Sequence, residues 1–194
     1  ADGRLDETFS PARWWAELGV ESVVPREDGS VYLVGMIRAG ATNDLVRIAR
    51  TLPDGSVDDA FHYVGNWVYS AGLTSPDGGI HVVTSNLKSD LQTTYLDVLR
   101  LRPDGTPDRG FRIEVSGRNY VIGSDIHNPP TIVSMARQVD GRLLLAGKFD
   151  RVNGVVRRNV ARLEADGSLD RTFDPGTGPA LSSDGSNFGY PVRG

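Results

Sequence analysis

Carboxylates are the side chains that this sequence repeats at fixed spacing. The pattern D-G-x-x-D-x-x-F occurs at 2–9, 54–61, 104–111 and 166–173. Two aspartates four residues apart, such as Asp54 and Asp58, could bind a hard cation such as Ca²⁺. They could equally accept hydrogen bonds from their own turn and from nearby backbone N–H groups. Because the spacing lacks the dense alternation of a calcium loop, we expect turn capping and predict no metal site.

Other reactive side chains are few. The three histidines, His62, His81 and His127, have no ligand spacing such as H-x-x-x-H, and His81 lies in a predicted strand, where a position in the core or on a sheet face is expected. The chain has no cysteine, which excludes disulfides, a thiolate nucleophile and Cys-ligated zinc. It also has no nucleophile elbow, phosphate-binding loop or dinucleotide fingerprint. We therefore predict no catalytic residue and no cofactor.

The composition limits the class of protein further. With 19 Asp against 6 Glu, 23 Gly and 11 Pro, the chain is rich in turn residues and poor in helix formers. The net charge is −4, and the 19 Arg and 2 Lys are scattered, which argues against a nucleic-acid partner. No run of about 18 apolar residues exists, so we expect no membrane insertion.

The octets mark an internal repeat with spacings of 52, 50 and 62 residues. A second series of Asp-Gly pairs, at Asp28, Asp77 and Asp140, lies 26 or 27 residues ahead of the next octet. Each pair of the second series is followed by a short apolar run, which is a predicted strand, and another run that we predict to be the third strand of the unit precedes the next octet. In this third strand Leu and Ile alternate with Arg, as expected of a strand with one side in water. We also predict a short fourth strand through each octet to its Phe.

These features predict an all-β fold of β-propeller-like blades, each a four-stranded antiparallel meander of about 50 residues. The Asp-Gly hairpins should be tight turns, because both residues tolerate φ > 0. The predicted divisions are the end of a preceding blade at 1–11, blade 1 at 12–62, blade 2 at 63–112, blade 3 at 113–174 with a long inserted loop at 117–130, and the start of a further blade or a tail at 175–194.

The third unit also carries a family resemblance. The segments 138–149, 152–155, 158–163 and 166–178 resemble the delta-60 repeat, and the similarity extends in weaker form over residues 1 to 178. That family consists of bacterial propeller-like repeats of large exported or surface proteins. The resemblance implies an extracellular or cell-surface location, and the family supplies no catalytic motif.

Two groups of residues are candidates for a role. The inserted loop holds polar and aromatic side chains that could contact a sugar or a peptide, namely Arg118, Asn119, Tyr120, Asp125 and His127. The loop could equally be a surface excursion or a contact between subunits. The repeat anchors are expected to pack between neighbouring blades or to hold the turns, and they are Phe9, Phe61, Phe111, Phe173, Asp54, Asp104 and Asp166.

The number of blades directs the functional prediction. Closed propellers use 4–8 blades, whereas this chain contains three complete units, so two blade faces would lack a neighbour. We therefore predict a non-catalytic structural or interaction segment that associates with other copies of itself or with flanking blades of a longer chain. The alternative is a ligand-binding, lectin-like propeller that uses the inserted loop and the tryptophans Trp14, Trp15 and Trp67. A propeller enzyme acting on polysaccharide is the third candidate, and it would need acidic side chains that converge on a central channel.

Overall fold

The computed structural model describes residues 4, 7–8, 19–39, 44–63, 65, 68–85, 88, 93–118, 121–122, 125–126 and 130–176. Within them every regular element is a strand, and all strand pairs are antiparallel. The all-β fold of propeller-type blades is therefore confirmed. No helix in this part of the chain could span a bilayer.

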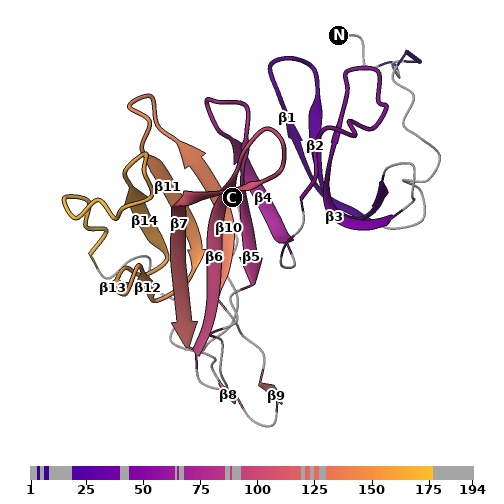
Figure 1. Ribbon diagram of the computed structural model, residues 1–194. Coiled ribbons are helices and arrows are strands. Elements are labelled where there is room, and N and C mark those ends of the chain that lie inside the picture. The colour runs from indigo at the N-terminus through magenta and orange to yellow at the C-terminus, as the bar shows by residue number, and fades with distance from the viewer. Residues whose placement is uncertain are drawn as a thin grey trace.

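Three blades follow one another along the chain (Figure 1). The first consists of β1 (Val20–Pro25), β2 (Val31–Ala39) and β3 (Asp44–Thr51). The second consists of β4 (Val68–Thr74), β5 (Ile80–Ser85), β6 (Thr93–Leu101) and β7 (Pro107–Arg118). The third consists of β10 (Thr131–Arg137), β11 (Leu143–Lys148) and β14 (Val160–Leu163). Each blade is an antiparallel meander; in blades 1 and 2 strands adjacent in sequence pair, whereas in blade 3 β11 pairs with β14 and two short strands lie between them in the chain.

The fourth strand differs between the blades. In blades 1 and 3 the octet contributes only an isolated bridge, Thr51 with Val57 and Leu163 with Leu169. In blade 2 the strand β7 begins in the octet and continues to residue 118, paired with β6 along its length. The continuation has an apolar residue at every second position, including the fully buried Ile113 and Val115, which holds it against the core.

All six described Asp-Gly turns share one geometry. In the first, the Gly29 N–H donates to the carbonyl of Arg26, and the Arg26 N–H donates to the carbonyl of Ser30. The glycines have φ between 81° and 88°, whereas no described Asp has positive φ. The hairpin turns expected at the Asp-Gly pairs are therefore present, and only the glycine of each pair uses positive φ. The turn is a three-residue loop whose last residue is a left-handed glycine, the second common hairpin connection.

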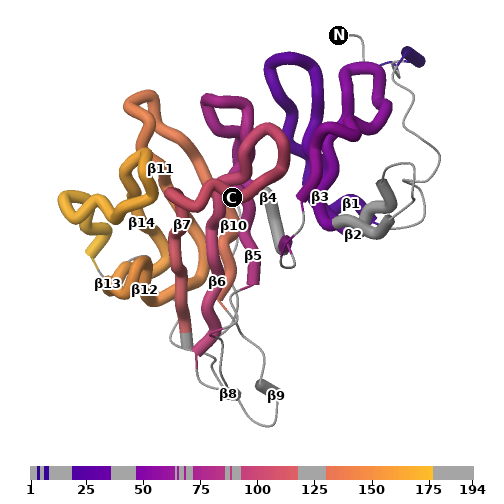
Figure 2. Tube along the Cα trace, in the orientation of Figure 1, coloured from indigo at the N-terminus to yellow at the C-terminus, as the bar shows by residue number. Residues whose placement is uncertain are grey.

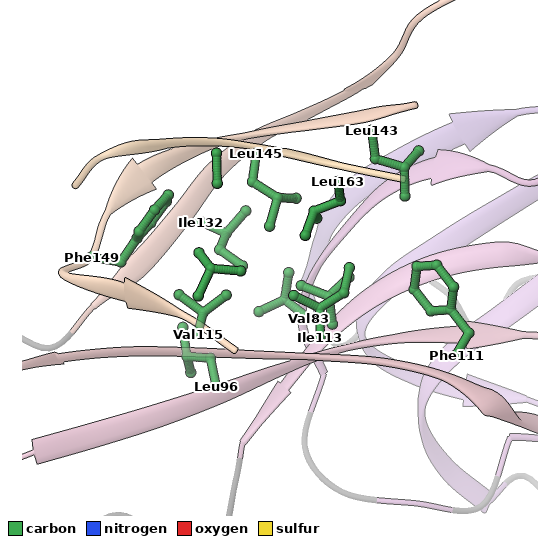
Figure 3. Close-up of a cluster of buried hydrophobic side chains, with 13 residues drawn as sticks. Val83, Leu96, Phe111, Ile113, Val115, Ile132, Leu143, Leu145, Phe149 and Leu163 are labelled. Atoms are coloured by element: carbon green, nitrogen blue, oxygen red, sulfur yellow. The ribbon is translucent and has the colours of Figure 1, made fainter. Parts of the chain in front are cut away.

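The hydrophobic core lies between blades. One cluster joins blades 1 and 2 and includes Val34, Phe61 and Val82. The other joins blades 2 and 3 and includes Phe111, Ile113, Leu143, Leu145 and Leu163. Figure 3 shows the side chains of the second cluster filling the space between the two sheets. Each blade therefore buries its apolar side chains mainly against its neighbours, as in other repeat proteins.

A hairpin from blade 3 extends the sheet of blade 2. It consists of β12 (Arg151–Val152) and β13 (Val155–Val156), and β12 pairs with residues 115–116 of β7. Asn153 and Gly154 at its tip have φ of 49° and 76°, which is the arrangement of a tight turn with two left-handed residues. Asn153 also accepts a hydrogen bond from the N–H of Glu114 through its side-chain oxygen, at 2.9 Å.

The two ends of the blades differ in character. Because the connections from first to second strand and from third to fourth strand lie at the same end of a meander, the Asp-Gly turns gather at one end (Figure 2). The hairpin of β8 (Val121–Ile122) and β9 (Asp125–Ile126) lies at the other end, between β7 and β10.

Candidate functional site

The inserted loop is only partly described. Arg118 is the last residue of β7 and pairs with Thr93, and Asp125 opens β9 opposite Ile122. Asn119, Tyr120 and His127 lie outside the described residues, as do Trp14, Trp15 and Trp67. The backbone therefore places Arg118 and Asp125 on one connection at the end opposite the Asp-Gly turns. Contacts among the five candidate side chains are not part of the described structure.

In the three octets whose turns the structure describes, the first aspartate holds its own turn. The Oδ1 atom of Asp54 accepts hydrogen bonds from the Ser56 N–H at 2.9 Å and from the Ser56 hydroxyl at 2.6 Å. Asp104 and Asp166 accept the corresponding N–H at 2.9 Å. Hydrogen bonds to the charged form lower the pKa of all three carboxyl groups. These carboxylates therefore stay ionised and stabilise the turn.

The second aspartate of the octet pairs with an arginine eight residues earlier. The Oδ2 atom of Asp58 lies 2.7 Å from Nε and 2.6 Å from Nη2 of Arg50, while Oδ1 accepts a hydrogen bond from the Ala60 N–H. The same pairing joins Arg100 to Asp108 and Arg162 to Asp170. The two aspartates of an octet therefore serve different partners. In the described part of the chain, no group of three or more potential metal ligands comes together.

The octet phenylalanine completes a repeated Arg–Asp–Phe triad. The guanidinium carbon lies 5.5 Å from the ring centroid in Arg50–Phe61, 5.3 Å in Arg100–Phe111 and 4.8 Å in Arg162–Phe173. Phe61 and Phe111 are buried in the two clusters between blades, whereas Phe173 is half-buried. Phe9, the corresponding residue of the first octet, lies outside the described residues.

The triad of blade 1 also contacts the next blade. The Arg50 guanidinium donates to the carbonyl of Pro103 at 2.6 Å. Tyr32, the fourth residue after Asp28, packs edge-on against Phe61 and donates through its hydroxyl to the carbonyl of Gly78 at 2.8 Å. These two hydrogen bonds satisfy the Arg50 guanidinium and the Tyr32 hydroxyl and join blade 1 to blade 2.

His81 occupies the position of Tyr32 in blade 2. Its ring lies edge-on to Phe111 with centroids 4.9 Å apart, and the residue is 3% exposed. Burial lowers its pKa to about 4, and the positive charges of Arg100 and Arg137 add to this effect, while a hydrogen bond with the Leu73 backbone opposes it. Its Nδ1 atom has no hydrogen-bond partner. His81 is therefore a neutral core residue between blades 2 and 3.

The triad is the feature that sequence reasoning missed. The arginines of the third strand were expected to face water, but the guanidinium of Arg50 is turned to the blade interface, and the residue is only 9% exposed. Pairing with Asp58 compensates the charge and allows this burial. The signal was present in the sequence, since Arg stands four residues before the octet at Arg50, Arg100 and Arg162.

Comparison with known families supports a β-propeller repeat. Residues 26–61 and 138–173 match the family model described as "Domain of unknown function (DUF5122) beta-propeller". Each matched segment runs from the residues just before an Asp-Gly turn to the octet Phe of the same blade, so the matches cover the turns and the triads of blades 1 and 3. No curated protein and no solved structure matches the chain.

Proposed function

We propose that this propeller segment is non-catalytic and mediates protein–protein association through an outward blade face. That face belongs to blade 3 and consists of Leu144, Ala146, Val160, Arg162 and Phe173, which we call the outward face. Leu144 pairs with Arg162 and Ala146 with Val160, so these side chains lie on one side of the sheet. Their sequence neighbours Leu143, Leu145, Ala161 and Leu163 point into the core toward blade 2.

The incomplete burial of this face supports the proposal. Leu144, Ala146, Val160 and Phe173 are half-buried and belong to neither hydrophobic cluster among the described residues. Blades 1 and 2 bury the equivalent positions between blades, apart from the half-buried Arg100. An apolar sheet face that is less covered than its equivalents in a repeat protein is a candidate association surface.

The test is the absolute mass of the 194-residue chain by light scattering over a dilution series. We expect the mass to rise from 21.0 kDa toward twice that value as concentration increases, because two outward faces can cover each other. Val160→Asp places a charge on the face and should yield a monomer. Val156→Asp is the matched control, since Val156 is an exposed valine on β13, and this variant should associate like the wild type. A wild-type monomer at every concentration would refute the proposal.

The inserted loop supports a second candidate, ligand binding of the lectin type. The observation that favours it is the β8–β9 hairpin, which extends the connection from β7 to β10 at the end opposite the Asp-Gly turns. Glycan-array binding that is lost in Tyr120→Ala and Asp125→Ala together would support this function. An array without any bound glycan would exclude carbohydrate as the ligand.

We further propose that the chain is a delta-60-type repeat protein of the bacterial cell exterior. The two Asp-Gly series and the complete third unit support the repeat type, and the absence of cysteine is compatible with an oxidising environment. Fractionation of the native host with an antibody against this chain would test the location. Recovery in the cytoplasmic fraction alone would refute it.

A further inference from the structure

The two blade interfaces in this chain follow one rule of contact. In each blade the side chains at the fourth and sixth positions after the Asp of the first turn face the next blade. These are Tyr32 and Val34 in blade 1, both fully buried, and His81 and Val83 in blade 2, exposed by 3% and 1%. The octet Phe of the same blade, Phe61 or Phe111, completes this face. In both cases the partner is the blade that follows in the sequence.

The receiving blade presents different positions. Its third and fifth residues after the Asp are aliphatic and lie against the preceding blade: Ile80 and Val82 in blade 2, Leu143 and Leu145 in blade 3. In blade 3 the octet glycine lies against the preceding octet Phe, because a Cβ added at Gly167 would stand 3.2 Å from a ring carbon of Phe111. In blade 2 the octet glycine, Gly105, lies instead against the backbone of His62, the residue after Phe61. The face of the preceding blade therefore packs against a blade that has aliphatic residues at the third and fifth positions after the Asp of its first turn.

The outward face of blade 3 has the same chemistry as the faces that are already covered. Leu144 and Ala146 hold the fourth and sixth positions, and Phe173 lies beside Arg162 as Phe61 lies beside Arg50. The difference lies in burial, because these positions are half-buried in blade 3 and fully buried in blades 1 and 2.

Blade 1 of a second copy is a poor occupant of this face. Of its two receiving positions, Val31 is half-buried and Leu33 is exposed by only 6%, and their partners on β3, Thr51 and Ala49, are exposed by 0% and 3%. A second copy would have to displace the groups that cover them. The open face and the closed one are therefore not a free complementary pair.

We propose that the outward face of blade 3 is the docking site for a further blade of the same repeat, which would present aliphatic residues at the third and fifth positions and an octet glycine against Phe173. This inference rests on the proposed association function and names its partner. A further blade is then the specific partner of the outward face. Two outward faces pair with each other only when no such blade is present.

The experiment uses an extended chain in which residues 174–194 are replaced by a second copy of residues 62–111. The new junction then repeats the natural step from Phe61 to His62. Since the chain has no cysteine, a single thiol introduced by Ala146→Cys reports on the face through its rate of maleimide labelling. Val156→Cys, at the exposed position on β13, is the matched control. Both thiols are compared in the original and the extended chain across a dilution series.

We expect labelling at Cys in place of Ala146 to slow by about tenfold or more in the extended chain at every concentration, because a docked blade must open before the reagent enters. The control thiol should react equally in both chains. A charge at the receiving positions of the added copy, Ile80→Asp with Val82→Asp in that copy alone, should restore fast labelling.

Three results would overturn the inference. One is fast labelling of the Ala146→Cys thiol in the extended chain. Another is the absence of slowly exchanging amides in the added unit when hydrogen exchange is measured, because a blade that docks on this face must be folded. The third is protection that disappears on dilution in both chains, which would assign the face to a second copy. This third result leaves the association function intact, whereas a wild-type monomer in light scattering contradicts that function without touching the labelling result.

Discussion

The buried histidine between blades 2 and 3 should make the stability of this protein depend on pH between about 6.5 and 4. His81 has a folded-state pKa of about 4 against an ordinary value of 6.5, so the unfolded chain binds its proton more strongly than the folded chain does. Stability is therefore complete above pH 6.5 and falls as the pH drops toward 4. Linkage gives a loss of about 2 kcal/mol at pH 5 and about 3 kcal/mol at pH 4 relative to pH 7.

The assay is urea unfolding at pH 7, 6, 5 and 4, with His81→Leu as the comparison. Leu is chosen because Leu144 holds the same position in blade 3. The charged groups around the ring, Asp77, Arg100 and Arg137, are unchanged in the variant, so their titration cancels between the two proteins. We expect the free energy of unfolding of the wild type to decline more steeply than that of the variant between pH 6.5 and 4. Parallel pH profiles for the two proteins would refute the assignment of a depressed histidine pKa to this interface.

Three further predictions concern the packing between blades, and all can be measured by urea unfolding at pH 7. Phe61→Ala removes the ring shared by blades 1 and 2 and should cost about 3–5 kcal/mol; a cost below 1 kcal/mol would contradict its place in the core. Asp58→Asn leaves the Arg50 guanidinium without its carboxylate and should cost about 2–4 kcal/mol, and an unchanged midpoint would argue against the buried pair. Gly147→Ala should cost more than about 2 kcal/mol because the new methyl group overlaps the opposing strand, while Gly154→Ala should cost only about 1–2 kcal/mol, for its left-handed φ of 76° in open space. The reverse order of the two glycine variants would refute this reasoning.

The sequence predicted the blades because their signals are local. An Asp-Gly pair marks a hairpin wherever it stands, and two series in register define a repeat without any long-range information. The sequence did not define the turn type, because local propensity allows Asp at positive φ, whereas the flanking strands select the loop in which only Gly29 and its equivalents need it.

The missed features depend on partners that are distant in space. Arg50 looked like a water-facing strand residue because its carboxylate stands eight residues later and its carbonyl acceptor, at Pro103, belongs to the next blade. The pairing of the β12–β13 hairpin with β7 could not be predicted for the same reason, since nothing in the sequence around Asn153 indicates that its side chain accepts a hydrogen bond from the Glu114 N–H. The candidate residues of the inserted loop stay a prediction, because three of the five lie outside the described part of the chain.

The pairing of the β12–β13 hairpin with β7 affects how the molecule should respond to force. The strands β10, β11 and β14 form a sheet of their own, but β12, which lies between β11 and β14 in the chain, pairs with β7, so a backbone ladder ties this segment of blade 3 to the sheet of blade 2. Among the described residues, blade 1 is joined to blade 2 without such a ladder, by side-chain contacts and by the hydrogen bond from the His62 N–H to the Asp104 carbonyl. A molecule pulled by its two ends should therefore yield in two events of unequal force. Blade 1 would detach first, and the pair of blades 2 and 3 would then rupture as one unit with a single, larger gain in contour length.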